Sequence, residues 1–163
     1  PMPEEFREAM EWVVGERLFE WVQKLDTKMP FDEIEKQTKA ILEEGHSRGL
    51  SVRTQPTIEF LSEKLNCWIE KLFHDPDPTL VHKIEKVLGL AKALGIALHD
   101  RIAQDLFFAF AQRILREWIE AYHQEPADRA RLEMIQAVLR LGDQLGFNMD
   151  QYEIQLKSKA GVR

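Results

Sequence analysis

A short phrase of sequence centred on tryptophan occurs three times and constrains the fold more than any other feature. Each tryptophan is followed directly by valine or isoleucine and, eight or nine positions later, by a proline. A proline in this position ends a helix, because its ring fixes φ and removes a backbone donor. The tryptophans that carry the phrase are Trp21, Trp68 and Trp118.

A second phrase alternates with the first and ends in a glycine followed by an apolar residue. Its glycines, Gly49, Gly95 and Gly146, are 46 and 51 residues apart, a period typical of stacked two-helix units. We therefore predict an all-α fold of six to seven helices, arranged as repeated two-helix units in a bundle or a short α-solenoid.

The first predicted helix opens after Pro3 and runs to about Asp26. Its apolar residues recur every three or four positions, which is the spacing of one buried stripe. We expect this stripe to contain Phe6, Met10, Val13, Val14, Leu18, Phe19, Val22 and Leu25. The later helices are expected at about residues 32–48, 54–74, 79–94, 100–123, 127–145 and 150–157.

The recurring glycines and tryptophans receive structural roles. A glycine just past a helix end adopts the left-handed conformation that lets two amides reach back to the last carbonyls, and we predict this for all three glycines. An exposed row of tryptophans would offer a stacking platform for a ligand. Because the tryptophans recur at equivalent positions of the repeat, we instead expect the three indoles to pack between neighbouring helices.

The predicted helix at 100–123 is the most apolar of the chain, which is typical of a central helix. Three phenylalanines lie close together in it, at Phe107, Phe108 and Phe110. If the following helix does not cover them, they form an apolar patch of the kind that marks a protein interface. We therefore take these three residues as a candidate interaction face.

Two Glu-x-x-His pairs raise the question of a metal site, because carboxylate-bridged di-iron bundles use this spacing. The pairs are Glu43 with His46, and Glu120 with His123. Alignment of the repeats places glycine, lysine, arginine and aspartate level with the first pair, which indicates a row that faces solvent. The row of the second pair is mixed. We expect neither a metal nor another cofactor.

Composition excludes several functions. The net charge of −6 argues against a nucleic-acid partner, whose phosphates require clustered lysine and arginine. No apolar run is long enough to span a membrane. Cys67 is the only cysteine, so no internal disulfide forms, and we expect it to be half or fully buried beside Trp68. We predict a cytoplasmic protein with one helical domain over residues 1–163, either whole or a piece of a longer chain.

The segment Gly95-Ile96-Ala97-Leu98, leading into Ala103-Gln104-Asp105-Leu106-Phe107-Phe108, carries a resemblance to a known family. It is similar to a helical region of unknown function that follows the catalytic barrel in one branch of the family fifty-seven glycoside hydrolases. The opening helix and the segment from Glu44 to Gly49 fit the same rhythm, so that the resemblance covers about residues 3–110. It implies catalytic carboxylates on a barrel outside this chain.

These observations favour a noncatalytic helical interaction or scaffold module. Its partner is another protein, a parent catalytic domain such as that of a glycoside hydrolase, or a further copy of the chain. An independent binding protein that holds a partner helix or an apolar ligand between repeats is the main alternative, and a carboxylate-bundle metalloenzyme is a third. The sequence contains no Gly-rich phosphate loop, Gly-x-Ser-x-Gly or His-Glu-x-x-His motif.

Overall fold

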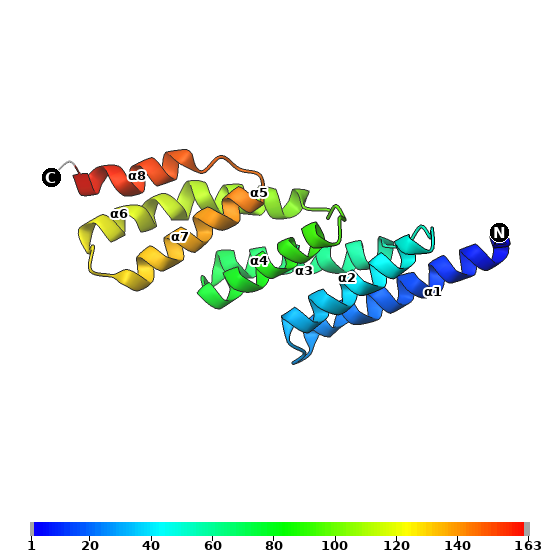
Figure 1. Cartoon of the computed structure of the whole chain (residues 1–163). Helices are drawn as coiled ribbons and strands as arrows, with labels where there is room; N and C mark the ends of the chain where they lie inside the picture. Colours follow the sequence, from blue (N-terminus) through cyan, green and yellow to red (C-terminus); the bar gives the residue numbers. More distant parts are fainter. Residues whose placement is uncertain (1, 162–163) are drawn as a thin grey trace. The chain divides into compact units, whose positions relative to one another are not determined.

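The computed structural model describes residues 2–161, and among these residues it consists of helices joined by short connectors, without a strand (Figure 1). The predicted all-α fold is therefore confirmed. The segments α5, η2 and α6 follow one another without a break and together correspond to the one helix predicted at residues 100–123. In chain order the elements are α1 (Glu4–Val22), the 3₁₀ turn η1 (Gln23–Asp26), α2 (Phe31–Ser47), α3 (Gln55–His74), α4 (Pro78–Ala93), α5 (Arg101–Phe110), the π-helical segment η2 (Ala111–Leu115), α6 (Arg116–Gln124), α7 (Arg129–Gln144) and α8 (Asp150–Gly161).

Contacts group the described residues of the chain into two compact units. The first unit comprises the described residues up to Lys64 together with Gly89–His99. It contains α1, η1, α2, the first half of α3 and the last turn of α4. The second unit comprises Leu65–Leu88 together with the described residues from Asp100 onward, and it contains the second half of α3, most of α4, and the elements from α5 to α8.

The three recurring glycines end helices in the predicted way. Their φ angles are 72°, 67° and 90°, and no other glycine among the described residues has a positive φ. At each of them the glycine amide and the next amide reach back to the helix. At Gly49, for example, the Leu50 amide donates to the Gly45 carbonyl at 3.0 Å and the Gly49 amide donates to the His46 carbonyl at 3.0 Å. This Schellman arrangement satisfies carbonyls that the helix end leaves without partners.

The buried row of each tryptophan phrase is displaced from the tryptophan itself. The three indoles are half-buried, while the residue after each one is at most 3% exposed. The leucine three positions before each tryptophan is fully buried as well. The row therefore consists of Leu18 and Val22, Leu65 and Ile69, and Leu115 and Ile119.

The stripe predicted for the first helix is wrong at two positions. Val14, Leu18 and Val22 are buried, but Phe6 is 57% exposed and Val13 is 51% exposed. The first three turns of α1 carry apolar residues on more than one face, so the three-to-four spacing includes residues that no other element covers.

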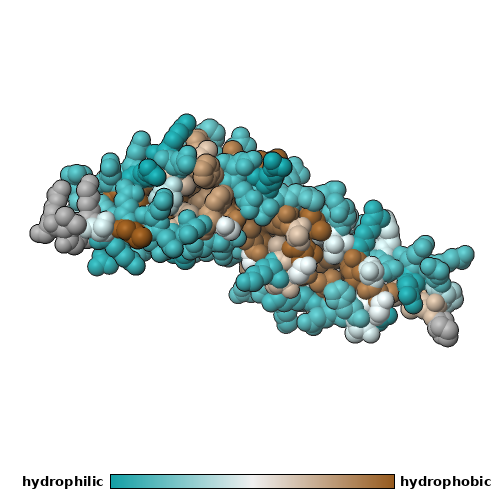
Figure 2. All heavy atoms as spheres, turned by 90° about the horizontal axis from the view of Figure 1, so that it is seen from above, coloured by the Kyte–Doolittle hydropathy of each residue, from teal (hydrophilic) through white to brown (hydrophobic). Residues whose placement is uncertain are grey.

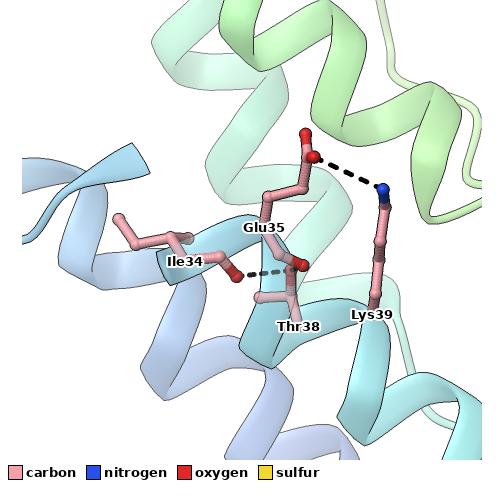
Figure 3. Close-up of polar contacts among 4 residues, drawn as sticks. All are labelled: Ile34, Glu35, Thr38 and Lys39. Carbon is pink, nitrogen blue, oxygen red and sulfur yellow. Dashed lines mark hydrogen bonds and ion pairs between the residues drawn. The ribbon is translucent and has the colours of Figure 1, made fainter. Parts of the chain in front are cut away.

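One polar residue occupies a core position of α2. Thr38 is fully buried and, when the repeats are aligned on their glycines, stands level with the buried Ile84 and Ile135. Its hydroxyl donates to the Ile34 carbonyl at 2.7 Å (Figure 3) and lies 3.0 Å from the Glu35 carbonyl. Because the hydroxyl is satisfied within its own helix, its burial leaves no polar group unpaired.

The third copy of the tryptophan helix contains a π-helical segment, η2. Gly95 and Trp118 are 23 residues apart, whereas Gly49 and Trp68 are 19 apart, so this copy has four additional residues. In a regular α-helix four residues turn about 40° beyond a full turn, since one turn holds about 3.6 residues. The π-helical segment lies within this longer copy. Leu115 and Ile119 are fully buried, like Leu65 in the preceding copy.

Candidate interaction groove beside the π-helical segment

A groove lies in the second unit where α5 and η2 meet the connector that leads into α8. One of its walls consists of the exposed residues Phe108, Gln112 and Arg116, which follow one another at four-residue spacing. The other wall comes from the connector and the first turn of α8. The volume of the groove is about 140 Å³. Its opposite wall and floor are formed by Phe147, Asn148, Gln151, Tyr152, Phe107, Ala111 and Met149.

Aromatic rings hold one end of the groove in shape. The Phe147 ring stacks on Phe107 with centroids 5.5 Å apart and on Phe108 with centroids 6.2 Å apart. Phe107 is 1% exposed, whereas Phe108 is 51% exposed. The buried ring therefore anchors Phe147, and Phe147 in turn positions the exposed ring. Stacked pairs at these distances are attractive beyond the area that they bury.

A cation lies at the other end of the groove. The guanidinium carbon of Arg116 lies 6.0 Å from the centroid of the Tyr152 ring. This is the outer limit of a cation–π contact, which restrains the guanidinium without consuming its hydrogen-bond donors. Among the described residues that line the groove, none is acidic, and three carry side-chain amides. The lining therefore combines apolar surface with polar groups and one positive charge.

The groove is too small for a typical small-molecule site. Ligand pockets usually enclose roughly 300–1,000 Å³, and the volume of this groove is less than half of the lower figure. The groove instead fits a single large side chain.

Figure 2 shows that hydrophilic residues cover much of the visible surface and that hydrophobic residues gather in limited patches between them.

The predicted interaction face requires a correction. Phe107 and Phe110 are 1% and 2% exposed and belong to the core, so only Phe108 of the three phenylalanines lies at the surface. Phe110 packs edge-on against Trp118, with centroids 5.4 Å apart, and also contacts Phe73. Phe107 and Phe110 are buried because they lie on the face of α5 that contacts the other helices of the second unit.

The two Glu-x-x-His pairs have different surroundings. Glu43 and His46 are exposed on α2, as the alignment of the repeats predicted. Glu120 is exposed too, but His123 is half-buried, and its Nε2 lies 2.8 Å from the Leu156 carbonyl of α8. His123 thus helps to hold α8 against α6 (Figure 1). Within residues 2–161, no group of three or more His, Cys, Asp or Glu side chains is placed to hold a metal ion.

The remaining residues of interest lie apart from the groove. The first two tryptophans of the phrase each have a lysine near the ring: the Lys24 ammonium lies 5.0 Å from the centroid of Trp21, and the Lys83 ammonium lies 6.0 Å from that of Trp68. Cys67 is exposed, which contradicts the expected burial. It follows Leu65 and precedes Ile69 in α3, so it lies on the side of the helix away from the buried row.

A second hollow lies in the first unit between α2 and the end of α4. It is larger, about 430 Å³, but it is wide open and half polar. Its charged lining consists of Lys39, Glu43, His46 and Lys92. The Lys39 ammonium is already paired with Glu35 at 3.3 Å, as the dashed line in Figure 3 shows. The shallow form and mixed charges give this hollow no preference for one class of ligand.

The comparisons with known proteins assign no role to either site. Comparison with known protein families, with curated protein sequences and with solved structures finds no match. None of the helices in the described part of the chain has both the length and the apolar character needed to cross a membrane. The fold defines the chain as an all-α protein built from helical repeats.

Proposed function

We propose that this protein is a noncatalytic helical interaction module and that the groove beside η2 receives one large apolar side chain of a partner. The observation that carries the proposal is the exposed ring of Phe108, held in place by Phe147 at the mouth of a groove with an apolar floor. Aromatic residues and arginine are enriched at the centres of protein interfaces, where they contribute most of the binding energy.

The polar groups of the groove indicate what surrounds that side chain. Arg116 supplies donors in a fixed fork, and the amides of Gln112, Asn148 and Gln151 accept and donate. An arginine held against an aromatic ring favours a carboxylate on the partner, because the guanidinium fork matches carboxylate geometry. We therefore expect the partner segment to present an aromatic or aliphatic residue beside an acidic one.

Selection of helical peptides by phage display on the purified protein tests this proposal. We expect the selected peptides to share an apolar anchor with a nearby Asp or Glu. Phe108→Asp should weaken their binding by at least about tenfold, because it places a carboxylate where the apolar anchor binds. Binding is measured by fluorescence polarisation with labelled peptides.

A matched control lies on α8. Ile154 is 65% exposed and does not line the groove, so Ile154→Asp introduces the same charge on an apolar residue that, like Phe108, is more than half exposed. Peptide binding by this variant should equal that of the wild type. Peptides whose binding is indifferent to Phe108→Asp, or equally reduced by both substitutions, would contradict the role of the groove.

The sequence resemblance supplies a first natural partner for the module. We propose the catalytic barrel of a family fifty-seven type glycoside hydrolase, packed against this module in the cytoplasm. Its support is the resemblance over about residues 3–110, which includes the opening helix and the segments from Glu44 to Gly49 and from Gly95 to Phe108. Isothermal titration of the purified barrel into the protein measures the interaction. Absence of heat and of co-elution would remove this partner and leave the groove proposal standing.

A further inference from the structure

The position eight residues before each repeated tryptophan reveals how successive tryptophan-bearing helices contact each other. In α3 this position is Phe60, whose ring lies 6.0 Å, edge-on, from Phe19 of α1. In the third copy it is Phe110, whose ring lies 6.0 Å from Phe73 of α3. In both cases the residue packs against an aromatic ring of the preceding tryptophan-bearing helix. The equivalent residue of α1 is Val13.

Val13 belongs to an exposed apolar face of α1, which we call the α1 outer face. It consists of Phe6, Ala9 and Val13, at intervals of three and four residues. Phe6 and Val13 are both more than half exposed, and Ala9 is exposed as well. Residues at this spacing lie on one side of a helix, and such a face docks against another helix. By the repeat equivalence, a partner that covers Val13 would present an aromatic ring to it.

The charges around this face are mainly negative. α1 contains six glutamates and two arginines. Glu16 and Glu20 continue the line of Val13 at intervals of three and seven residues, toward the end of the helix. Arg17 lies 3.8 Å from Glu44 of α2, so its charge is partly matched within the first unit. A complementary surface is therefore positively charged and carries an aromatic residue.

The groove wall in the second unit has these properties. Between Arg101 and Arg116 the chain carries three arginines and one aspartate, and all four are exposed. The exposed Phe108 lies in the middle of this stretch. Arg113 and Arg116 rest near the Phe73 and Tyr152 rings, which leaves their donors available. The positive charge of this stretch is complementary to the negative charge around the α1 outer face, and Phe108 supplies the exposed aromatic ring.

We infer that the α1 outer face of one copy docks on the Phe108 groove of a second copy. This inference rests on the proposed function, since it names the partner of the same groove. Phe6 or Val13 provides the apolar anchor, and Glu16 or Glu20 provides the neighbouring carboxylate that faces Arg116. Complementary charges steer such an encounter and fix its register.

Complementation between two variants tests this contact. The wild type should associate with rising concentration, so that its mass in sedimentation equilibrium exceeds the monomer value of 19.1 kDa. Val13→Asp and Phe108→Asp should each remain monomeric. A mixture of the two should form a 1:1 complex, because the intact groove of the first variant receives the intact α1 outer face of the second. Added salt should weaken every complex, because it screens the charges.

Several measurements keep the inference open to refutation. Circular dichroism verifies that each variant is folded, and Arg116→Glu provides a second groove variant that leaves the apolar packing intact. Ile154→Asp should associate like the wild type. A wild type that stays monomeric at all concentrations overturns the inference, as does a mixture without a heterodimer. If peptides still bind in a Phe108-dependent manner in that case, the proposed function survives and only the identity of the partner is wrong.

Discussion

Met149 fills the space beside Gly142 in which any other residue would place its β-carbon. A β-carbon built on Gly142 would lie 2.5 Å from Met149 Sδ and 2.8 Å from its Cε. Met149 is 2% exposed and stands three residues after Gly146, so the connector folds back on the last turn of α7. Val52 occupies the same place in the first unit, 2.5 Å from a β-carbon on Gly45.

Gly142→Ala should therefore destabilise the protein. The added methyl group displaces a buried side chain, and overpacking of this kind costs about 1–3 kcal/mol. Urea unfolding followed by circular dichroism measures the change in the free energy of unfolding. In the Gly142→Ala background Met149→Ala should cost less than in the wild type, since the smaller side chain relieves the clash.

Gly89 provides the matched control for this substitution. It lies within α4, and a β-carbon at this position would meet no atom within 4 Å. Alanine there reduces the conformational entropy that the chain loses on folding, so Gly89→Ala should stabilise the protein by about 0.5–1 kcal/mol. A Gly142→Ala variant that gains stability like Gly89→Ala would show that Met149 moves aside without cost.

Substitution of Gly95 measures the cost of backbone strain without a contribution from steric crowding. Its φ is +67°, and a β-carbon there would have no neighbour within 4 Å. Gly95→Ala should cost about 1–2 kcal/mol through the left-handed conformation alone, and Gly95→Asn should cost less because asparagine tolerates this region better. Thermal unfolding compares the two variants. Equal losses would indicate that the helix end does not retain this conformation in solution.

The repeat predicted the helices and their ends because both depend on local sequence. The spacing of tryptophan, proline and glycine located the ends of most helices to within a few residues. The change of spacing from 46 to 51 residues was the signal for the π-helical segment, but spacing alone does not distinguish an added turn from a wider one. The residue after each tryptophan, and not the tryptophan, proved to be the fully buried one.

The groove was only partly predictable, because it depends on contacts between distant residues. Phe108 was identified together with Phe107 and Phe110, and periodicity does not decide which of three neighbouring rings is covered. Its partner Phe147 lies 39 residues later in the sequence, directly after the third recurring glycine, so no local pattern connects the two rings. Val13 was assigned to the core for a related reason: a stripe of apolar residues does not reveal whether another helix covers it.

Cys67 should react as an exposed thiol in the folded protein. Its side chain is accessible on α3, between the buried positions of Leu65 and Ile69. Ellman's reagent should modify one equivalent without denaturant, at a rate within about tenfold of that in unfolded protein, since access does not limit the reaction. Cys67→Ser gives the blank. A thiol that reacts only after unfolding would show that this side of α3 is covered in solution.

Phe107 and Phe108 are adjacent in sequence, but substitution of Phe107 should mainly reduce folding stability, whereas substitution of Phe108 should mainly reduce peptide binding. Phe107 is 1% exposed, and its replacement by alanine leaves a cavity that costs about 3–5 kcal/mol. Phe108 is 51% exposed and loses mainly its stacking on Phe147, so Phe108→Ala should cost less than about 1 kcal/mol of folding stability. Urea unfolding measures both losses, and peptide binding measures function. The Phe108→Ala variant should lose peptide binding while it remains folded. A loss of stability as large as that of Phe107→Ala would instead place Phe108 in the core and leave the groove without its exposed aromatic ring.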